Sequence, residues 1–475
     1  MMQTKVNPYL DDNFAPVQRE ITSDTLEIIG ELPPQLSGMF LRNGPNPQYS
    51  PIGQYHWFDG DGMIHGVRLH NGRANYCNRY VRTRGWQLEH EAGKAIWSGL
   101  LEPPQLDNPD GPTKNTANTA LVWHAGTMLA TWEGGAPHAI DVPTLDTIGK
   151  YTYDGKLSSS FTAHPKIDPM TGEMMFFGYS FSPPYLQYSV VSSGGKLLRT
   201  VPIEIPMAVM MHDFAITEHY TIFMDLPLTF NRERMQRGEP PLMFENNKPS
   251  RFGIVPRHSD NSDIRWFETS ACYVFHTLNA YEEGDEVVLI ACRMNSTNVL
   301  TENTESALED STPRLHQWRF NLNTGTISET MLDDVAADFP RVNENFLGLA
   351  TRYGYAGRMT GGSMPLFDGV IKYDLNTGKS QTHEFGSERF GGEAVFAPHP
   401  DGKDEDDGWL ITFVRDCAPR SGKANRHSET SELVIIDAKD VTSEPVARVL
   451  IPQRVPYGFH GAWIDEAQLE TSCGN

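Results

Sequence analysis

Cysteine is scarce in this chain and widely scattered. The 475 residues include five cysteines, and none of them forms a Cys-x-x-Cys pair with another. A thiolate zinc site is therefore not indicated, nor is the disulfide framework of a small secreted domain.

Basic charge and long apolar runs are also in short supply. The chain has 39 Lys and Arg against 61 Asp and Glu, a formal net charge of −22. This balance argues against nucleic acid as a partner, because phosphates require clustered cations. No apolar run approaches the roughly 18 residues of a membrane-spanning helix, and the first residues lack the pattern of a signal peptide. We expect a cytoplasmic protein whose membrane contact, if any, is peripheral.

Helical periodicity is scarce as well, and short strands separated by polar turns take its place. Residues 319–326 and 371–379 are near copies of one strand–turn element, and 434–441 is a looser third. Such recurrence at irregular spacing is typical of propeller blades whose period is blurred by insertions. The sequence therefore predicts an all-β fold, a β-propeller.

No linker or shift in composition divides the chain. We predict a single domain over residues 1–475, with 1–35 as an N-terminal arm packed on it. Helices are expected only in insertions such as 231–238 and 305–309. The Asp-Gly-Asp-Gly run at 59–62 predicts a hairpin turn followed by a strand.

Some histidines lie at the edges of apolar, strand-like runs far apart in sequence. They are His164, His212, His276 and His460. Any one of them could be an ordinary core or surface residue. A propeller would bring them together, because its inner strands line a central channel. We therefore hypothesise that the imidazoles converge on one metal ion.

Imidazole ligands suit zinc, copper, iron and nickel. A closed zinc site would usually recruit cysteine or cluster its ligands locally, and neither pattern is present. An open Fe(II) site with neutral ligands fits an uncharged substrate, and nearby carboxylates would orient the imidazole N–H groups. Glu133, Asp338 and Glu393 are candidates, since each is an acid in an apolar or glycine-rich setting. A turn or capping role would explain each of them equally well.

The other histidines are weaker candidates. His56, His65 and His124 lie beside turns, where a loop role is sufficient. His138 and His383 lie among polar residues and are expected to be solvated. No convincing Ser-His-Asp or Cys-His arrangement suggests nucleophilic catalysis.

A set of short motifs, taken in their order along the chain, indicates a protein family more specifically than any one of these patterns does. The motifs are Phe-Leu-Arg-Asn-Gly-Pro at 40–45, Phe-Asp-Gly-Asp-Gly-Met at 58–63, Ala-His-Pro at 163–165, His-Asp-Phe-Ala-Ile-Thr at 212–217, Phe-His at 275–276 and Gly-Phe-His at 458–460. On these motifs the chain resembles the carotenoid cleavage oxygenases over nearly its whole length. The resemblance implies a seven-bladed β-propeller with Fe(II) on its axis and a cap of helical and loop insertions over the metal.

The resemblance also implies a role for each candidate residue. It makes His164, His212, His276 and His460 the iron ligands, and Glu133, Asp338 and Glu393 the acids that orient them. Asp338 stands where several members of the family carry glutamate. Because aspartate is one methylene shorter, we expect its contact with a ligand imidazole to be longer or bridged by water.

The runs at 162–169, 223–227 and 454–460 look like the plant enzymes that cleave carotenoids at the 9,10 and 9′,10′ bonds. This implies an enzyme that uses O2 to cleave a double bond of a carotenoid or apocarotenoid into aldehyde or ketone products. Stilbene-cleaving relatives carry lysine just before the first of the acids, whereas this chain has Trp132. The alternatives are a stilbene-type or other polyene-cleaving dioxygenase and, from another class, a non-catalytic propeller scaffold. Residues 227–244 carry apolar clusters that we expect to dip into a membrane; the alternative is a loop packed on the rim of the propeller.

Overall fold

The computed structural model describes residues 7–237, 240–297, 309–362, 364–417 and 431–472, in which β-strand is the main regular secondary structure. The chain divides into two compact units, neither of which is continuous in sequence. Unit 1 comprises Met1–Thr152, Phe385–Asp401 and Gly408–Asn475, and unit 2 comprises Tyr153–Glu384 and Gly402–Asp407. The predicted all-β class is confirmed.

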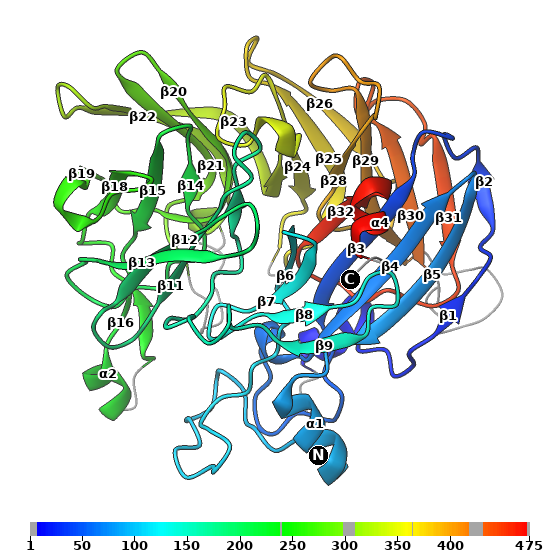
Figure 1. Cartoon of the computed structure of the whole chain (residues 1–475), viewed down its shortest axis with the longest axis horizontal. Helices are drawn as coiled ribbons and strands as arrows, with labels where there is room; N and C mark the ends of the chain where they lie inside the picture. The colour runs from blue at the N-terminus through cyan, green and yellow to red at the C-terminus, as the bar shows by residue number, and fades with distance from the viewer. Residues whose placement is uncertain (1–6, 238–239, 298–308, 363, 418–430, 473–475) are drawn as a thin grey trace. The chain divides into compact units, whose positions relative to one another are not determined.

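Unit 2 is built from antiparallel sheets whose strands follow one another in the sequence (Figure 1). The first sheet contains β10 (Lys166–Ile167), β11 (Met174–Tyr179), β12 (Leu186–Val191) and β13 (Leu197–Ile203). The second contains β14 (Ala215–Ile216), β15 (Tyr220–Asp225), β18 (Ser250–Pro256) and β19 (Arg265–Thr269). The next strands in sequence are β20 (Tyr273–Glu283), β21 (Glu286–Met294), β22 (Arg314–Asn321) and β23 (Ile327–Arg341), and from β21 onward each is paired with the one before it. Strand β23 also pairs with β24 (Tyr353–Met359). The ladder continues from β24 to β25 (Phe367–Asp374) and then to β26 (Lys379–Glu384). A small hairpin, β16 (Leu228–Phe230) and β17 (Leu242–Phe244), carries the short helix α2 (Arg232–Gln236) between its strands.

Unit 1 has the same antiparallel character (Figure 1). One sheet has the strand order β1 (Thr22–Ser23), β5 (Arg73–Tyr80), β4 (Gly62–His70), β3 (Gly38–Pro45) and β32 (Gly461–Asp465). Another consists of β6 (Ala120–His124), β7 (Thr127–Thr131), β8 (His138–Ile140) and β9 (Thr147–Lys150). A third runs from β2 (Ile28–Gly30) through β31 (Ala447–Ile451) and β30 (Ser431–Asp437) to β29 (Gly408–Asp416), which also pairs with β27 (Arg389–Gly391) and β28 (Val395–Pro398).

The helices are short and lie outside the sheets. Those that lie wholly within the described ranges are α1 (Arg84–Ala92), α2 and α4 (Glu466–Ser472), together with the 3₁₀ turns η1 (Pro8–Leu10), η2 (Asp12–Phe14), η3 (Trp57–Asp59), η4 (Asn261–Asp263) and η5 (Glu344–Phe346). Helix α2 falls inside the predicted insertion at 231–238, whereas most of the one predicted at 305–309 lies outside the described residues. Within the described part of the chain, no helix is both long enough and apolar enough to cross a bilayer.

The two near-copy strand–turn elements are alike in the structure. The turn between β22 and β23 and the turn between β25 and β26 each end in a glycine with positive φ, Gly325 (+73°) and Gly378 (+64°). Before each glycine, the side chain of Asn321 or Asp374 accepts hydrogen bonds from backbone N–H groups of its own turn. A short polar side chain and a left-handed glycine are what such a turn requires.

Apolar faces of successive sheets pack together inside each unit. In unit 2, one cluster joins β11 and β12 to β15 and β18, with Phe177, Phe214 and Phe223 fully buried. In unit 1, Phe40 on β3 packs with Phe413 on β29 at a ring-centroid distance of 5.1 Å. Burying a side chain of this size contributes roughly 1.5–3 kcal/mol, so these sheet faces hold the strand ends in place.

The N-terminal arm adds two short strands to unit 1: β1 pairs with β5, and β2 pairs with β31. The hairpin predicted at 59–62 is wrong, although the following strand, β4, is present. Asp59 instead closes η3 by accepting the backbone N–H groups of His56 and Leu100. Asp61 accepts from the backbone of Gln48 and forms an ion pair with Lys114 at 2.9 Å. Both carboxylates are thus committed to other segments, which a tight two-residue turn would not allow.

Candidate metal centre

Three of the predicted histidines lie where the chain enters an edge strand of unit 2. His164 comes two residues before β10, and His212 three residues before β14. His276 lies near the start of β20, in an irregular stretch where the ladder with β21 shifts register between Val274 and Thr277. Such a bulge changes the direction of a side chain, which then no longer follows the regular alternation between the two faces of the sheet.

The three imidazoles converge through their Nε2 atoms. The Nε2 of His212 lies 3.0 Å from that of His164 and 3.2 Å from that of His276. His212 and His276 are buried and His164 is half-buried. Ring nitrogens this close, two of them on buried side chains, suit a shared cation better than three separate roles.

Asp338 orients the imidazole of His276. Its Oδ1 lies 2.8 Å from the His276 Nδ1, and both side chains are buried. A carboxylate can only accept here, so Nδ1 carries the proton and Nε2 keeps its lone pair for a metal. The expectation of a longer or water-bridged contact is therefore wrong. The β23 ladder is irregular between Asp338 and Arg341, and Phe339 adopts φ = +55°, so the backbone itself brings the shorter side chain close.

Asp213 is a site residue that the sequence analysis missed. It directly follows His212, and its Oδ2 accepts hydrogen bonds from the backbone and hydroxyl of Thr277, which directly follows His276. Its Oδ1 forms an ion pair with Lys166 at 2.8 Å. Burial raises the pKa of Asp213, but Lys166 and these hydrogen bonds outweigh burial and hold the pKa below its usual value. The ionised side chain thus ties together the segments that carry the three histidines. The only signal in the sequence was its place beside His212.

His460 belongs to unit 1 and lies immediately before β32. A buried carboxylate contacts its imidazole, as Asp338 contacts that of His276. Its Nδ1 lies 3.0 Å from Oε1 of Glu393, whose Oε2 accepts the backbone N–H of Gly461 at 2.7 Å. The His460 carbonyl accepts from Asn43 on β3 at 3.1 Å. Both His460 and Glu393 are buried. The pairing again leaves the Nε2 of the imidazole as its metal-binding atom.

Glu133 lies in the turn after β7 of unit 1, with a half-buried side chain. Its pairing with a ligand histidine stays a prediction. The ring of the preceding Trp132 folds over the same turn and leaves no room for a side chain at Gly134.

His164, His212 and His276 of unit 2 form a group of imidazoles that could hold one metal ion. The role of His460 as a further ligand stays a prediction. Aromatic rings surround the imidazoles of unit 2: Phe275 lies 5.3 Å from His212 and Phe339 lies 5.0 Å from His276, centroid to centroid. Neutral nitrogen donors with apolar neighbours fit a transition metal such as iron, copper or zinc rather than the oxygen-seeking Mg²⁺ or Ca²⁺.

The cysteines that the structure describes take no part in this group. Cys77, Cys272, Cys292 and Cys417 are free and buried. Burial raises the pKa of Cys272 to about 11, so its thiol stays protonated at neutral pH.

Two histidines that were expected to be solvated, His138 on β8 and His383 on β26, are buried instead.

Comparison with known proteins places the chain in a family. Residues 14–465 match the family described as retinal pigment epithelial membrane protein. The chain belongs to this family, which includes the carotenoid cleavage oxygenases. The predicted resemblance is confirmed.

Relatives from plants and bacteria match nearly end to end. The chain is 44% identical to carotenoid 9,10(9′,10′)-cleavage dioxygenase 1 of Pisum sativum, covering 97% of this chain and 91% of the pea protein. The solved structure of the lignostilbene dioxygenase of Pseudomonas brassicacearum has a TM-score of 0.87 and 31% identity, covering 96% of this chain and 98% of that one. The Synechocystis apocarotenoid oxygenase, solved also in a cobalt-substituted form, has a TM-score of 0.83 and 29% identity, with coverages of 95% and 97%.

Proposed function

We propose that the protein is a non-haem Fe(II)-dependent dioxygenase that cleaves a carotenoid or apocarotenoid double bond with O2, at the 9,10 (9′,10′) position. The observation that carries the proposal is the set of converging Nε2 atoms in unit 2, with the His276 imidazole oriented by a buried carboxylate. The likeness to a pea enzyme named for this cleavage supports the substrate class.

In this proposal the metal ligands are His164, His212, His276 and His460, and the orienting acids are Glu133, Asp338 and Glu393. The strand-rich fold and the structural likeness to the family support a propeller, for which we propose seven blades, with the metal on its axis and the insertions as a cap. Such a protein would be one domain over its 475 residues. Its cytoplasmic location stays a prediction.

Each part of the chain has a defined task. Bound Fe(II) would supply the one-electron chemistry that lets O2 react with an alkene. Asp338 and Glu393 accept the Nδ1–H of the His276 and His460 imidazoles and so direct the Nε2 lone pairs toward a metal. Phe275 and Phe339 give the surroundings an apolar character that suits a polyene and excludes water. The alkene and O2 together contain all the atoms of the two carbonyl products, so no general base is needed.

A product assay tests the proposal. The iron-loaded protein is incubated with a C40 carotenoid and, separately, with a hydroxylated stilbene, and the products are separated and identified by mass. We expect two ketone end fragments and a central dialdehyde from the carotenoid. Aldehydes from the stilbene alone would instead favour the second candidate, stilbene cleavage, for which the likeness to the lignostilbene dioxygenase is the supporting observation.

We also propose that the β16–β17 hairpin touches a membrane, where a carotenoid would dissolve. Part of the predicted 227–244 segment does not face outward, since Leu228 is fully buried. Met243 is 41% exposed, and Phe181, 46% exposed, stacks on Phe230 of this hairpin at 4.1 Å. Among the described residues, Met243 of the segment and the neighbouring Phe181 therefore offer exposed apolar surface at this hairpin.

A further inference from the structure

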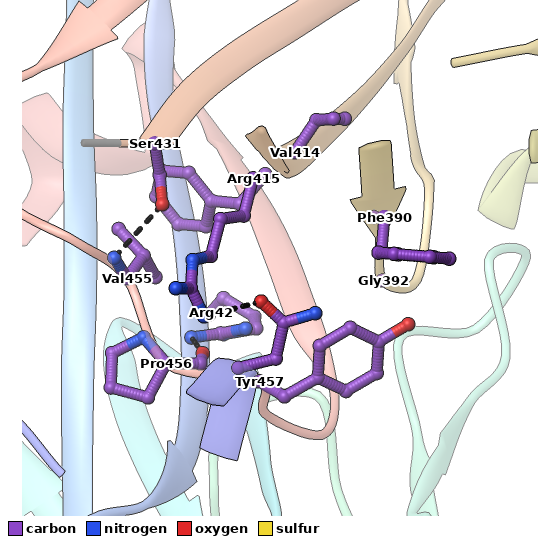
Figure 2. Close-up of a pocket in the computed structure, with 12 residues that line it drawn as sticks. Arg42, Phe390, Gly392, Val414, Arg415, Ser431, Val455, Pro456 and Tyr457 are labelled. Atoms are coloured by element: carbon purple, nitrogen blue, oxygen red, sulfur yellow. Dashed lines mark hydrogen bonds between the residues drawn. The ribbon is translucent and has the colours of Figure 1, made fainter. Parts of the chain in front are cut away.

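Unit 1 contains a pocket lined by two buried arginines, Arg42 on β3 and Arg415 on β29. Each arginine is 6% exposed. Figure 2 shows both among the lining side chains, together with Phe390, Val414 and Val455. The space between these side chains admits a guest of about the size of one water molecule.

Positive charge at this pocket exceeds negative charge. Arg415 meets Asp12 at 3.1 Å, but that carboxylate is 52% exposed. Arg42 has no acidic partner among the described residues, and its Nη2 donates to the carbonyl of Pro456 at 2.6 Å. A third cation, Arg454, lies close enough to Arg415 to lower its own pKa further. The acid on the adjoining strand, Glu432, is engaged elsewhere by Arg389 and Arg448.

The arginines also carry N–H groups that are not satisfied. The Nε atoms of Arg42 and Arg415 and the Nη1 of Arg454 are buried and meet no acceptor within the described ranges. A buried donor without an acceptor, and above all a buried charge without a counter-charge, is costly. Burial lowers the pKa of Arg42 and of Arg454 to about 10, and these two cations add to the effect of burial in lowering the pKa of His65. Within the described ranges, the pocket thus carries positive charge that the half-exposed Asp12 offsets only in part.

We propose that this pocket binds one small inorganic anion of the size of chloride. The unsatisfied donors are single N–H groups on separate guanidinium groups, not the parallel pair with which one arginine grips a carboxylate or phosphate. Together with the small free space, this favours a monatomic ion. A water molecule could accept these hydrogen bonds, but it could not balance the charge.

The position of the pocket gives the anion a structural role. Gly391 and Gly392 of its lining directly precede Glu393, and Pro456 lies four residues before His460. The guanidinium of Arg42 lies against Gly458 so closely that a side chain there would clash with it. An anion held by Arg42 and Arg415 thus joins β3 and β29 beside the segments that end in the Glu393–His460 pair. This site is independent of the proposed function.

Thermal unfolding of the full chain in potassium chloride, against potassium gluconate at equal ionic strength, tests the site. We expect chloride to raise the Tm along a single-site saturation curve, by about 2–3 °C at a hundredfold excess over its Kd. Arg415→Met should abolish this dependence. Arg352→Met, which removes an exposed arginine paired with Asp374, should retain it.

Bromide provides a second test that needs no variant. In crystals of the unmodified protein grown in bromide, one anomalous peak should lie within hydrogen-bond distance of the Nε atoms of Arg42 and Arg415. The proposal is overturned if chloride has no saturable effect, if Arg415→Met retains the full effect, or if no bromide occupies the pocket. A larger saturable shift with phosphate than with chloride would overturn the assignment to a small anion.

Discussion

Asp338 shows how much of the candidate metal centre depends on single residues. Its carboxylate accepts the Nδ1–H of His276 at 2.8 Å, in a place where glutamate was the residue expected from the family. The left-handed Phe339 and the irregular β23 ladder compensate for the missing methylene. Backbone strain of this kind collects at functional sites, and a sequence motif does not display it.

Asp338→Asn should weaken metal binding roughly 10- to 100-fold, because an amide holds the imidazole less firmly and lowers its basicity. Anaerobic titration of metal-free protein with Fe(II) measures the change. Asp368→Asn is a matched control, since Asp368 pairs with Arg358 at 2.7 Å on β25 and touches none of the histidines. Equal Fe(II) affinity for Asp338→Asn and the unmodified protein would show that this hydrogen bond has no role in the centre.

The sequence could identify the histidines and two acids that contact them, Asp338 and Glu393, because they lie in distinctive motifs. The role of Glu133 stays a prediction. The sequence could not identify Asp213, since the partners of that residue, Lys166 and Thr277, come from separate segments. The burial of His138 and His383 was missed because polar neighbours in sequence do not reveal which face of a strand packs inward.

At the scale of elements, buried polar contacts join neighbouring sheets of unit 2. Asp168, next to β10, forms an ion pair with Arg257, next to β18, at 2.6 Å, and both side chains are buried. Thr217 and the backbone of His219, on either side of the β14–β15 turn, both donate to Glu282 at the end of β20. These contacts fix the spacing of the strands whose entries carry the histidines.

Asp168→Asn should destabilise the protein by about 3 kcal/mol at neutral pH, because it leaves Arg257 buried without its counter-charge. Burial raises the pKa of Asp168, but the Met170 N–H, the Thr171 hydroxyl and Arg257 outweigh it and hold the pKa below its usual value. The folded state therefore favours the ionised form, and this stabilisation is complete above the unfolded pKa of about 4 and lost as pH falls through the folded pKa.

Denaturant unfolding of the two proteins across pH measures this dependence. The stability gap between the unmodified protein and Asp168→Asn should be constant above about pH 5 and shrink below about pH 4. A gap that widens on acidification would contradict the assigned direction of the pKa.

The β16–β17 hairpin yields a prediction at the same scale. The double variant Phe181→Ser, Met243→Ser should sediment less with carotenoid-bearing liposomes, because it removes exposed apolar area at the hairpin. Its iron content should be unchanged. Met170→Ser is a matched control, as Met170 is 74% exposed at the turn between β10 and β11. Equal sedimentation of the double variant and the control would exclude the hairpin as the membrane contact.

For the whole molecule, the strand-rich class and the repeated strand–turn elements could be predicted. The turns at Gly325 and Gly378 obey local chemistry, which a sequence displays directly. The number of blades could not be counted. Insertions such as the β16–β17 hairpin blur the period, and β23 belongs to one ladder with β22 and to another with β24. Long-range pairing of this kind has no local signal.

The central claim is that His164, His212, His276 and His460 hold one iron. Metal analysis of anaerobically purified protein tests it most directly, with His212→Ala as the variant and His219→Ala as the control, because His219 is solvent-exposed and bonded to Glu282. We expect about one iron per chain in the unmodified protein and in the control, and almost none in His212→Ala. Iron missing from the unmodified protein, or retained in full by His212→Ala, would rule out an iron site at these histidines and favour a non-catalytic scaffold.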